Sequence, residues 1–245
     1  MNFVSAVILG FLQGMTEFLP VSSSGHLVIA QSFIPGFTQP GVLFDVILHL
    51  GTTVAVLFYF RKKIYSISKE KIIVLVIGTV PAGIIGVLFN TEIEALFSSV
   101  KLVGLALLAT GLMDFGTDRF SGRKQVVSKL DGLMIGIGQA FAILPGVSRS
   151  GTTIFVGTSQ GIRRQEAAEF SFLLSVPAII GAGAVELVSH GATNNLSIFV
   201  YLGGLVSSFL TGILSISLVL RLLAEEKFKY FAVYCLIIGI AVLII

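Results

Sequence analysis

Six apolar stretches constrain the fold of this 245-residue chain more than any other feature. They cover residues 42–60, 72–90, 96–113, 167–188, 198–220 and 228–245. Each is close to the length of about 20 residues that a helix needs to cross the hydrocarbon core of a bilayer. Only 12% of all residues are charged, against about 25% in soluble domains. The sequence therefore predicts an all-α polytopic membrane protein with six transmembrane helices in a single membrane domain.

The loops between these stretches differ in charge, and this difference orients the chain. Loops that carry Lys and Arg are 61–71, 114–131, 163–164 and 221–229, whereas 91–99 and 189–197 carry neither. Because cytoplasmic loops hold the excess of Lys and Arg, we expect the four basic loops in the cytoplasm and both termini outside. The net charge of +3 therefore gives no indication of a nucleic-acid partner. The first 60 residues contain no Lys or Arg, so a signal peptide with a basic start is not expected.

Two regions remain, about 1–40 and 132–162, and each has an apolar start, a Pro-Ser-Gly break and a second apolar piece. Region 132–162 has to begin and end on the cytoplasmic side, and its arms are too short for two spans. We therefore expect both regions to form re-entrant helix–loop–helix hairpins. Non-helical backbone is tolerated at membrane depth only where protein or a water-filled cavity surrounds it.

The two hairpin regions also resemble each other. The sequence LPVSSSG at 19–25 parallels LPGVSRSG at 144–151, with one extra residue in the second copy. The pairs that share an offset of 126 residues are Gly25/Gly151, Phe44/Phe170, Leu48/Leu174, Gly78/Gly204 and Gly86/Gly212. Corresponding spans run in opposite directions, which predicts an inverted-topology repeat of about 1–120 and 127–245. The two tips would then meet near the midplane and form one site.

Both tips carry groups suited to phosphate chemistry. Gln13 and Glu17 lie four residues apart and share a helix face. Ser22, Ser23, Ser24 and Gly25 open the next helix, whose N-terminus attracts anions, and His26 follows Ser23 by three residues, within reach on one turn. The second tip supplies Ser148, Arg149, Ser150 and Thr153, and the forked guanidinium of Arg149 matches phosphate oxygens.

These residues suit the binding of a phosphate, its attack by a serine hydroxyl and proton transfer by His26 or Glu17. A carboxylate that holds Mg²⁺ or Ca²⁺ against the phosphate oxygens is an alternative. Structural roles stay open as well: the Ser and Gly residues as tight-turn residues, Glu17 with Arg149 as an intramembrane ion pair, and His26 as a packed histidine.

Other charged residues are open to two interpretations. Asp45 and His49 either line the same cavity or pair within their helix, and Glu169 has the same ambiguity. A charge at the centre of the bilayer costs about 3 kcal/mol on insertion scales, so such residues are functional candidates by default. We expect Asp114 and the charges of loops 61–71 and 114–131 to be solvated.

Four stretches carry a family resemblance: EFLPVSSSGHL at 17–27, PGVSRSGTT at 145–153, FDVILHLGT at 44–52 and EFSFLLSVP at 169–177. They resemble the undecaprenyl-pyrophosphate phosphatase family, also called bacitracin-resistance proteins, and the resemblance extends over nearly the whole chain. It implies an enzyme that hydrolyses undecaprenyl diphosphate to undecaprenyl phosphate and inorganic phosphate, recycling the lipid carrier for cell-wall glycans. It also implies a site that opens to the outer face of the cytoplasmic (plasma) membrane.

Roles carried over from the family are specific. The nucleophile falls on Ser23, the acidic motif on Gln13 and Glu17, the histidine on His26 and the phosphate-binding arginine on Arg149. The substrate-binding candidates are Gln13, Ser22, Ser24, Gly25, Ser148, Ser150 and Thr153. Family members need a divalent cation, usually Mg²⁺ or Ca²⁺. In the family the first acidic position is often Glu, whereas here it is Gln13. Glu17 is then the candidate metal ligand, and the diphosphate would have to supply most of the other ligands.

A second class of function fits the same architecture. Inverted repeats with broken helices that meet at the midplane are also typical of secondary transporters, so a transporter or flippase for a phosphorylated lipid is the alternative. The pairing of Ser, His and Glu with an arginine favours hydrolysis. The expected partners are a polyprenyl diphosphate lipid and the bilayer, and the oligomeric state is open, a homodimer included.

Overall fold

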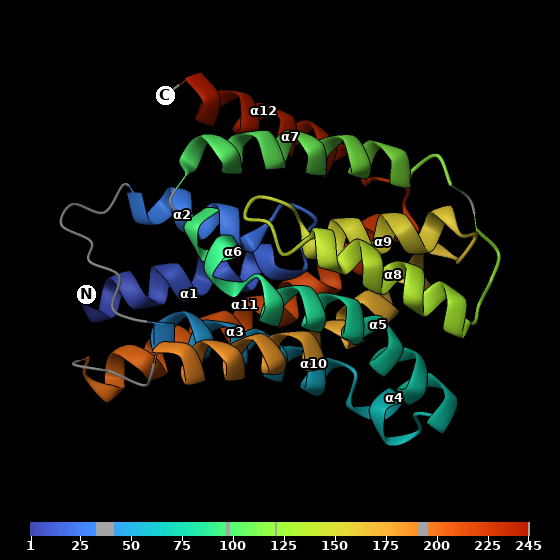
Figure 1. The fold of residues 1–245 in the computed structure, drawn as a ribbon, viewed down its shortest axis with the longest axis horizontal. Coiled ribbons are helices and arrows are strands. Elements are labelled where there is room, and N and C mark those ends of the chain that lie inside the picture. Colours follow the sequence, from blue (N-terminus) through green and yellow to red (C-terminus); the bar gives the residue numbers. More distant parts are fainter. Residues whose placement is uncertain (33–41, 97–98, 121, 191–195, 245) are drawn as a thin grey trace.

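The computed structural model describes residues 1–32, 42–96, 99–120, 122–190 and 196–244 (Figure 1). Within these ranges the chain forms helices and no β-strand, apart from one isolated bridge between Lys124 and Ile162. The helices are α1 Phe3–Phe18, α2 Ser23–Ser32, α3 Val42–Tyr59, α4 Arg61–Tyr65, α5 Lys69–Leu88, α6 Asn90–Leu96, α7 Val100–Thr117, α8 Lys129–Phe141, α9 Arg149–Ser159, α10 Arg164–His190, α11 Ile198–Ala224 and α12 Lys229–Ile244.

Each predicted span coincides with one helix, in the order α3, α5, α7, α10, α11 and α12. Among the described residues four of them, α5, α7, α10 and α11, are long and apolar enough to cross a membrane, whereas α3 and α12 are shorter apolar helices. The all-helical membrane fold is therefore confirmed. The count of six spans stays a prediction.

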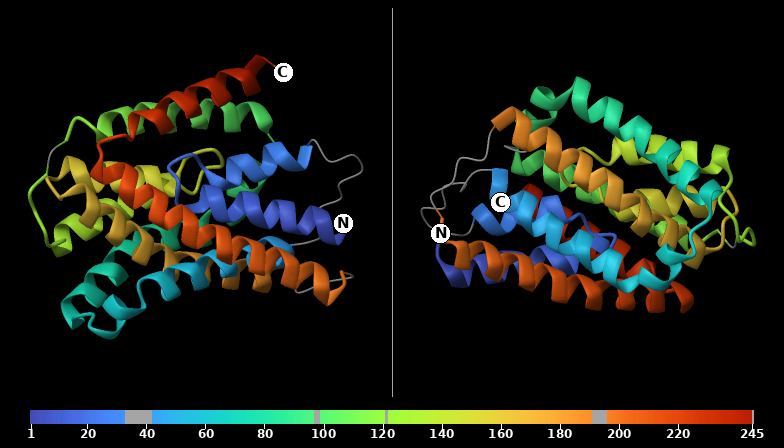
Figure 2. Two further views of the ribbon diagram at one scale, coloured as in Figure 1. Left: turned by 180° about the vertical axis from the view of Figure 1, so that it is seen from behind. Right: turned by 90° about the horizontal axis from the view of Figure 1, so that it is seen from below.

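The two hairpin regions form α1–α2 and α8–α9, and they enter the molecule from opposite ends (Figures 1 and 2). Their connecting turns lie together in the middle. Ser150 Oγ donates a hydrogen bond to the Leu19 carbonyl at 3.0 Å, and a Cβ built on Gly25 would lie 3.2 Å from Gly146 Cα. The prediction that the two tips meet is confirmed.

Each hairpin packs its first helix against a long helix, α1 against α11 and α8 against α5. Glycines allow both contacts. A Cβ on Gly10 would lie 2.4 Å from the Gly204 carbonyl oxygen, and a Cβ on Gly136 would lie 2.4 Å from the Gly78 carbonyl oxygen. Small residues let helix backbones approach closely in membranes. The two crossings use positions that differ by the same 126 residues.

We expect Gly10→Ala and Gly136→Ala to destabilise the protein by about 1–3 kcal/mol each, because the new methyl group would meet a backbone oxygen that cannot move aside. Gly83 on α5 has no atom within 4 Å of its Cβ position among the described residues, so Gly83→Ala is the matched control. Thermal unfolding in detergent measures the difference. Wild-type midpoints for both crossing variants would contradict the close approach.

The remaining helices position the tips. Helices α7 and α12 pack along each other and cover one side of the molecule (Figure 1), and α7 also contacts α2 and α9. On the other side, the rings of Phe18 in α1 and Phe172 in α10 meet edge to face with centroids 5.3 Å apart. Both rings are fully buried. This contact fixes the end of α1, where the first tip begins, against α10.

Two carboxylates that were expected to be solvated are buried, so that prediction is wrong. Helix α7 extends to Thr117, past the expected end at 113, and carries Asp114 into the interior with an exposed fraction of 0%. Neither Asp114 oxygen has a hydrogen-bond partner among the described residues. Asp131 is also buried, and its carboxylate is satisfied by a capping box with Ser128 at the start of α8 and by a pair with Lys124 at 3.2 Å.

Candidate active site

The two tips begin their second helices in the same way. Ser22 Oγ accepts a hydrogen bond from the Gly25 N–H at 3.3 Å, and Ser148 Oγ accepts one from the Gly151 N–H at 3.1 Å. Serine is a preferred cap because its oxygen satisfies a backbone N–H group of the first helical turn. Two capped helix N-termini, α2 and α9, therefore converge, and their positive ends favour a bound anion.

The serine pairs match as well, whereas the turns differ in where a positive φ occurs, since Ser148, the equivalent of Ser22, has φ −74°. Ser22 Oγ lies 3.3 Å from Ser24 Oγ, and Ser148 Oγ lies 3.2 Å from Ser150 Oγ. Each turn also contains one residue with positive φ: Ser22 at 66° and Gly146 at 91°. Positive φ is uncommon for residues other than glycine. Ser22 therefore holds a strained conformation at the position that directly precedes Ser23.

A polar cluster joins the tips at Ser23. Its hydroxyl donates a hydrogen bond to Glu17 Oε2 at 2.7 Å, and Gln13 Nε2 donates to the same oxygen at 2.8 Å. The other carboxylate oxygen, Oε1, accepts from Arg149 Nη2 in an ion pair. Glu17 is buried, with an exposed fraction of 7%. The structure thus brings together four residues that the sequence assigned to one site.

Arg149 makes a second contact, from Nη1 to the Ser171 carbonyl at 3.3 Å. These two bonds use two of the five N–H groups of the guanidinium, which leaves donors for a phosphate. Glu17 and Arg149 neutralise each other at the tips. The converging helix N-termini then make the site positive, which suits a phosphate group.

Both ring nitrogens of His26 contact groups other than Ser23. Its Nδ1 lies 2.8 Å from the Ser22 carbonyl oxygen and its Nε2 lies 2.8 Å from the Tyr234 hydroxyl. A carbonyl only accepts hydrogen bonds, so we assign the proton to Nδ1 and the donor role to Tyr234. The two rings stack with an interplanar angle of 11°. The expected contact between His26 and Ser23 is not formed, and the partner of Ser23 is Glu17.

His49 joins the cluster from α3. Its Nε2 lies 3.9 Å from Glu17 Oε2, and its Nδ1 bonds to the backbone carbonyl of Asp45 at 2.8 Å. His49 therefore lies beside the polar cluster and also bonds to the backbone of Asp45 within its own helix. Because the Asp45 carbonyl is the partner of Nδ1, the other ring nitrogen of His49, Nε2, faces Glu17.

Comparison with known proteins gives the chain its family. The family model described as "Bacitracin resistance protein BacA" matches residues 6–241. The chain belongs to the BacA family. Its curated relatives include proteins from Syntrophotalea carbinolica (44% identical over 255 residues, 98% of this chain and 97% of the relative), Halothermothrix orenii (40% over 256 residues, 100% and 98%) and Methanosphaera stadtmanae (37% over 274 residues, 100% and 98%). Each of these relatives is named undecaprenyl-diphosphatase.

Several hydroxyls of the BacA-family motifs are used inside the protein. Ser150 and Ser148 are 1% exposed and Thr153 is 0% exposed. Thr153 Oγ1 donates to the Arg149 carbonyl at 2.8 Å and lies 2.6 Å from Ser171 Oγ. These bonds hold the second tip in place, as the turn interpretation expects. Ser23 and Ser24 are only half-buried.

The residues at the tips of this BacA-family chain do not by themselves form a divalent-cation site. Among the described residues no group of three or more His, Cys, Asp or Glu side chains is placed to hold a metal ion. Glu17 is the carboxylate of the cluster, and both of its oxygens accept hydrogen bonds from protein donors. Gln13 Oε1 is buried without a hydrogen-bond partner in the described part. A cation held at Glu17 would take its remaining ligands from water or other oxygen atoms.

For two residues the structure differs from what the sequence indicated about the site. Glu169 lies away from the tips and pairs with Lys63 and with Lys71, the latter at 3.0 Å. Tyr234, in the last apolar stretch, was not singled out, and its only signal was a hydroxyl within an apolar helix. Its contact with His26 spans 208 residues of sequence, which no local pattern encodes.

Proposed function

We propose that this chain is an undecaprenyl-diphosphate phosphatase, which hydrolyses undecaprenyl diphosphate to undecaprenyl phosphate and inorganic phosphate and so recycles the lipid carrier for cell-wall glycan synthesis. The observation that carries the proposal is the Ser23 hydroxyl bonded to Glu17 beside Arg149, where two helix N-termini meet. Membership of the BacA family and relatives named undecaprenyl-diphosphatase support it.

In the first step, Ser23 Oγ attacks the terminal phosphorus while Glu17 Oε2 takes the hydroxyl proton. The bond from this phosphorus to the bridging oxygen breaks, and undecaprenyl phosphate leaves as an anion that needs no added proton. Arg149 and the first backbone N–H groups of α2 and α9 stabilise the charge on the phosphoryl oxygens, which is the main requirement of phosphoryl transfer.

In the second step, water attacks the phosphorus of the phosphoserine. The bond between phosphorus and Ser23 Oγ breaks, and Glu17 returns its proton to that oxygen. The protons of the water stay with the released phosphate. Covalent catalysis of this kind replaces one difficult displacement by two easier ones. All the residues involved lie in one chain, so a homodimer is not required.

His26 acts in this scheme as a positioning residue. Its bonds to the Ser22 carbonyl and to Tyr234 hold the strained turn that presents Ser23. We expect Tyr234→Phe to lower kcat by about 10-fold, the size of effect that loss of an orienting hydrogen bond gives at metal-ligand histidines. Steady-state phosphate release measures it. Tyr230→Phe is the control, because Tyr230 lies one turn earlier on the same helix and is exposed as Tyr234 is, while the bond to His26 comes from Tyr234. Equal activity of the two variants would show that the Tyr234 hydroxyl does not position His26.

We further propose that the chain has six spans and two re-entrant hairpins in an inverted repeat of about 1–120 and 127–245. The matching serine caps, the matching glycine crossings and the equivalence of Ser23 with Arg149 at an offset of 126 support this duplication. The positive-inside rule favours basic loops in the cytoplasm and both termini outside, and the family resemblance implies that the mouth of the site opens outside as well.

We propose that a divalent cation, Mg²⁺ or Ca²⁺, enters as a complex with the diphosphate. Hard cations of this kind take oxygen ligands, and the diphosphate supplies most of them, with Glu17 as the candidate protein ligand. A cation supplies neutralisation of phosphoryl charge when bound. The roles of Ser23, Glu17 and Arg149 in the two steps do not depend on this cation.

A lipid flippase is the second candidate, because broken helices that meet at the centre of an inverted repeat are a transporter architecture. Phosphate release by the purified, detergent-solubilised chain separates the two functions, since detergent removes the membrane that a flippase needs. We expect turnover of undecaprenyl diphosphate in detergent. Transfer of the lipid across vesicles without phosphate release in detergent would support the flippase.

A further inference from the structure

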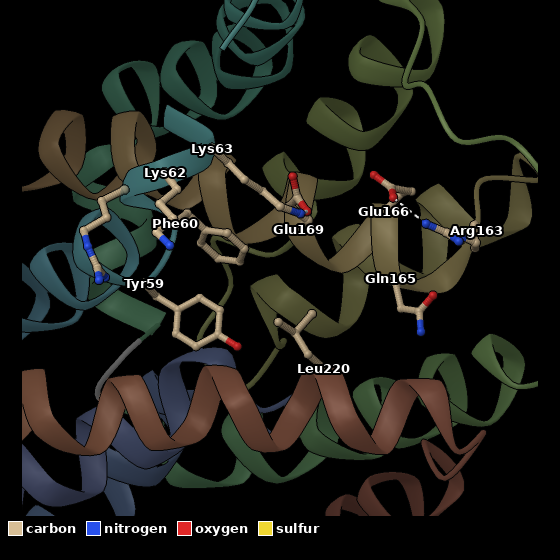
Figure 3. A pocket seen from close by; sticks show the side chains of 10 residues that line it. Tyr59, Phe60, Lys62, Lys63, Arg163, Gln165, Glu166, Glu169 and Leu220 are labelled. Carbon is tan, nitrogen blue, oxygen red and sulfur yellow. Dashed lines mark hydrogen bonds and ion pairs between the residues drawn. The ribbon is translucent and has the colours of Figure 1, made fainter. Parts of the chain in front are cut away.

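A cavity of about 630 Å³ lies away from the tips, at the end of the molecule where α3 runs into α4 and where α10 begins (Figure 3). Arg61, Lys62, Lys63 and Arg163 line it, together with Glu166 and Glu169. It shares no lining residue with the cluster around Ser23. This cavity has no role in the proposed hydrolysis.

The charges that line the cavity favour an anion. Its four basic side chains face two carboxylates, and each carboxylate already has a cationic partner. Glu166 pairs with Arg163 at 2.7 Å, and Glu169 pairs with Lys63 and also with Lys71, which comes from α5. Two positive charges therefore remain in excess on the lining. A cationic ligand would have to break these pairs, whereas an anion would add to them.

Arg61 and Lys62 carry this excess charge. Arg61 lies over the Phe58 ring, 4.6 Å from its centroid, and donates to the Phe58 carbonyl at 2.9 Å. Lys62 is exposed. Both follow directly after α3, so both stand at the level where this apolar helix ends. Side chains at this level lie where phosphate groups of a bilayer would be.

Part of the cavity wall is apolar. Tyr59, Phe60 and Leu220 line the side formed by the ends of α3 and α11, and Figure 3 shows Tyr59 beside Leu220. Aromatic side chains with a polar tip are enriched at the membrane interface. A basic rim next to an apolar wall matches a phosphate group joined to a glycerol and acyl chains. Free phosphate would leave the apolar wall without a partner.

We propose that this cavity binds the headgroup of an anionic phospholipid, with Arg61 and Lys62 contacting its phosphate. Basic pockets between membrane helices recognise anionic lipid headgroups in this way, and each Lys or Arg near the surface adds about fivefold to the attraction. The lipid is a structural partner, distinct from the diphosphate substrate at the tips. The inference does not depend on the proposed hydrolysis.

The test measures lipid association and needs no turnover. The chain is reconstituted into phosphatidylcholine vesicles with spin-labelled phosphatidylglycerol or spin-labelled phosphatidylcholine, and the immobilised fraction of each label is compared. We expect wild type to prefer phosphatidylglycerol, and we expect Arg61→Gln/Lys62→Gln to reduce that preference by about 25-fold. Lys69→Gln/Arg123→Gln removes the same charge from exposed residues outside the cavity and should keep the preference.

Two results would overturn the proposal. An equal loss in the cavity variant and in the Lys69/Arg123 control would show diffuse surface attraction with no defined site. Displacement of labelled phosphatidylglycerol by inorganic phosphate, but not by chloride at the same ionic strength, would show a site for free phosphate. Unfolding is monitored by circular dichroism. The milder Lys62→Gln variant, expected to lose about fivefold, keeps the test valid if the double variant misfolds.

Discussion

Ser23→Ala is expected to lower kcat for phosphate release by about 10³-fold or more, because the variant lacks the oxygen that forms the covalent intermediate. The substitution removes one half-buried hydroxyl whose partner is Glu17. The fold should therefore persist, which size-exclusion chromatography and thermal unfolding can check. The measurement is steady-state phosphate release from undecaprenyl diphosphate by the purified variant.

Ser159→Ala is a matched control for this result, since Ser159 is an exposed serine at the end of α9, far along the helix from the tip. It should retain wild-type turnover. If Ser23→Ala also retained it, the serine would not be the nucleophile. Direct attack by a water that Glu17 activates would then be the better mechanism.

Arg149→Gln should lower kcat by a similar factor of about 10³, since no other side chain of the cluster can offer a fork of donors to the phosphoryl oxygens. Arg149→Lys keeps the charge and loses the fork, so its kcat should lie between those of wild type and Arg149→Gln. Arg221→Gln, which removes an exposed arginine, is the control. Full activity of Arg149→Lys would show that charge alone is required.

Arg149 also stabilises the buried Glu17, so the loss of activity has to be separated from a loss of stability. Removing one partner of a buried ion pair leaves an uncompensated charge and costs about 3–5 kcal/mol. Glu17→Gln/Arg149→Gln removes both charges and should recover much of the unfolding temperature that Arg149→Gln loses. Activity should stay low in the double variant. Recovery of activity with stability would indicate a purely structural ion pair.

Much of the fold follows from local sequence. The length of each apolar stretch and the placement of Lys and Arg are local properties, and they located the six helices. The Pro-Ser-Gly breaks located both hairpins for the same reason. Helix ends were less accurate, since α7 continues through Asp114 once α9 and α12 cover that face. Burial of a carboxylate depends on these neighbours.

The part of the site that lies within the two sequence motifs was predictable. Ser23, Glu17 and Arg149 were assigned from two motifs, and the offset of 126 explains why Ser23 and Arg149 take equivalent places at the two tips. The hydrogen bond of Ser23 to Glu17 in place of His26 depends on the angle of the turn at Ser22. The partner of His26, Tyr234, depends on the packing of α12.

The stereochemical course at phosphorus distinguishes a phosphoserine intermediate from direct attack by water. A terminal phosphoryl group made chiral with sulfur and oxygen isotopes is hydrolysed by the wild-type chain, and the configuration of the released thiophosphate is determined. Attack by Ser23 followed by attack of water comprises two in-line displacements. Overall retention of configuration is therefore expected. Inversion would show a single displacement by water and would contradict a phosphoserine at Ser23.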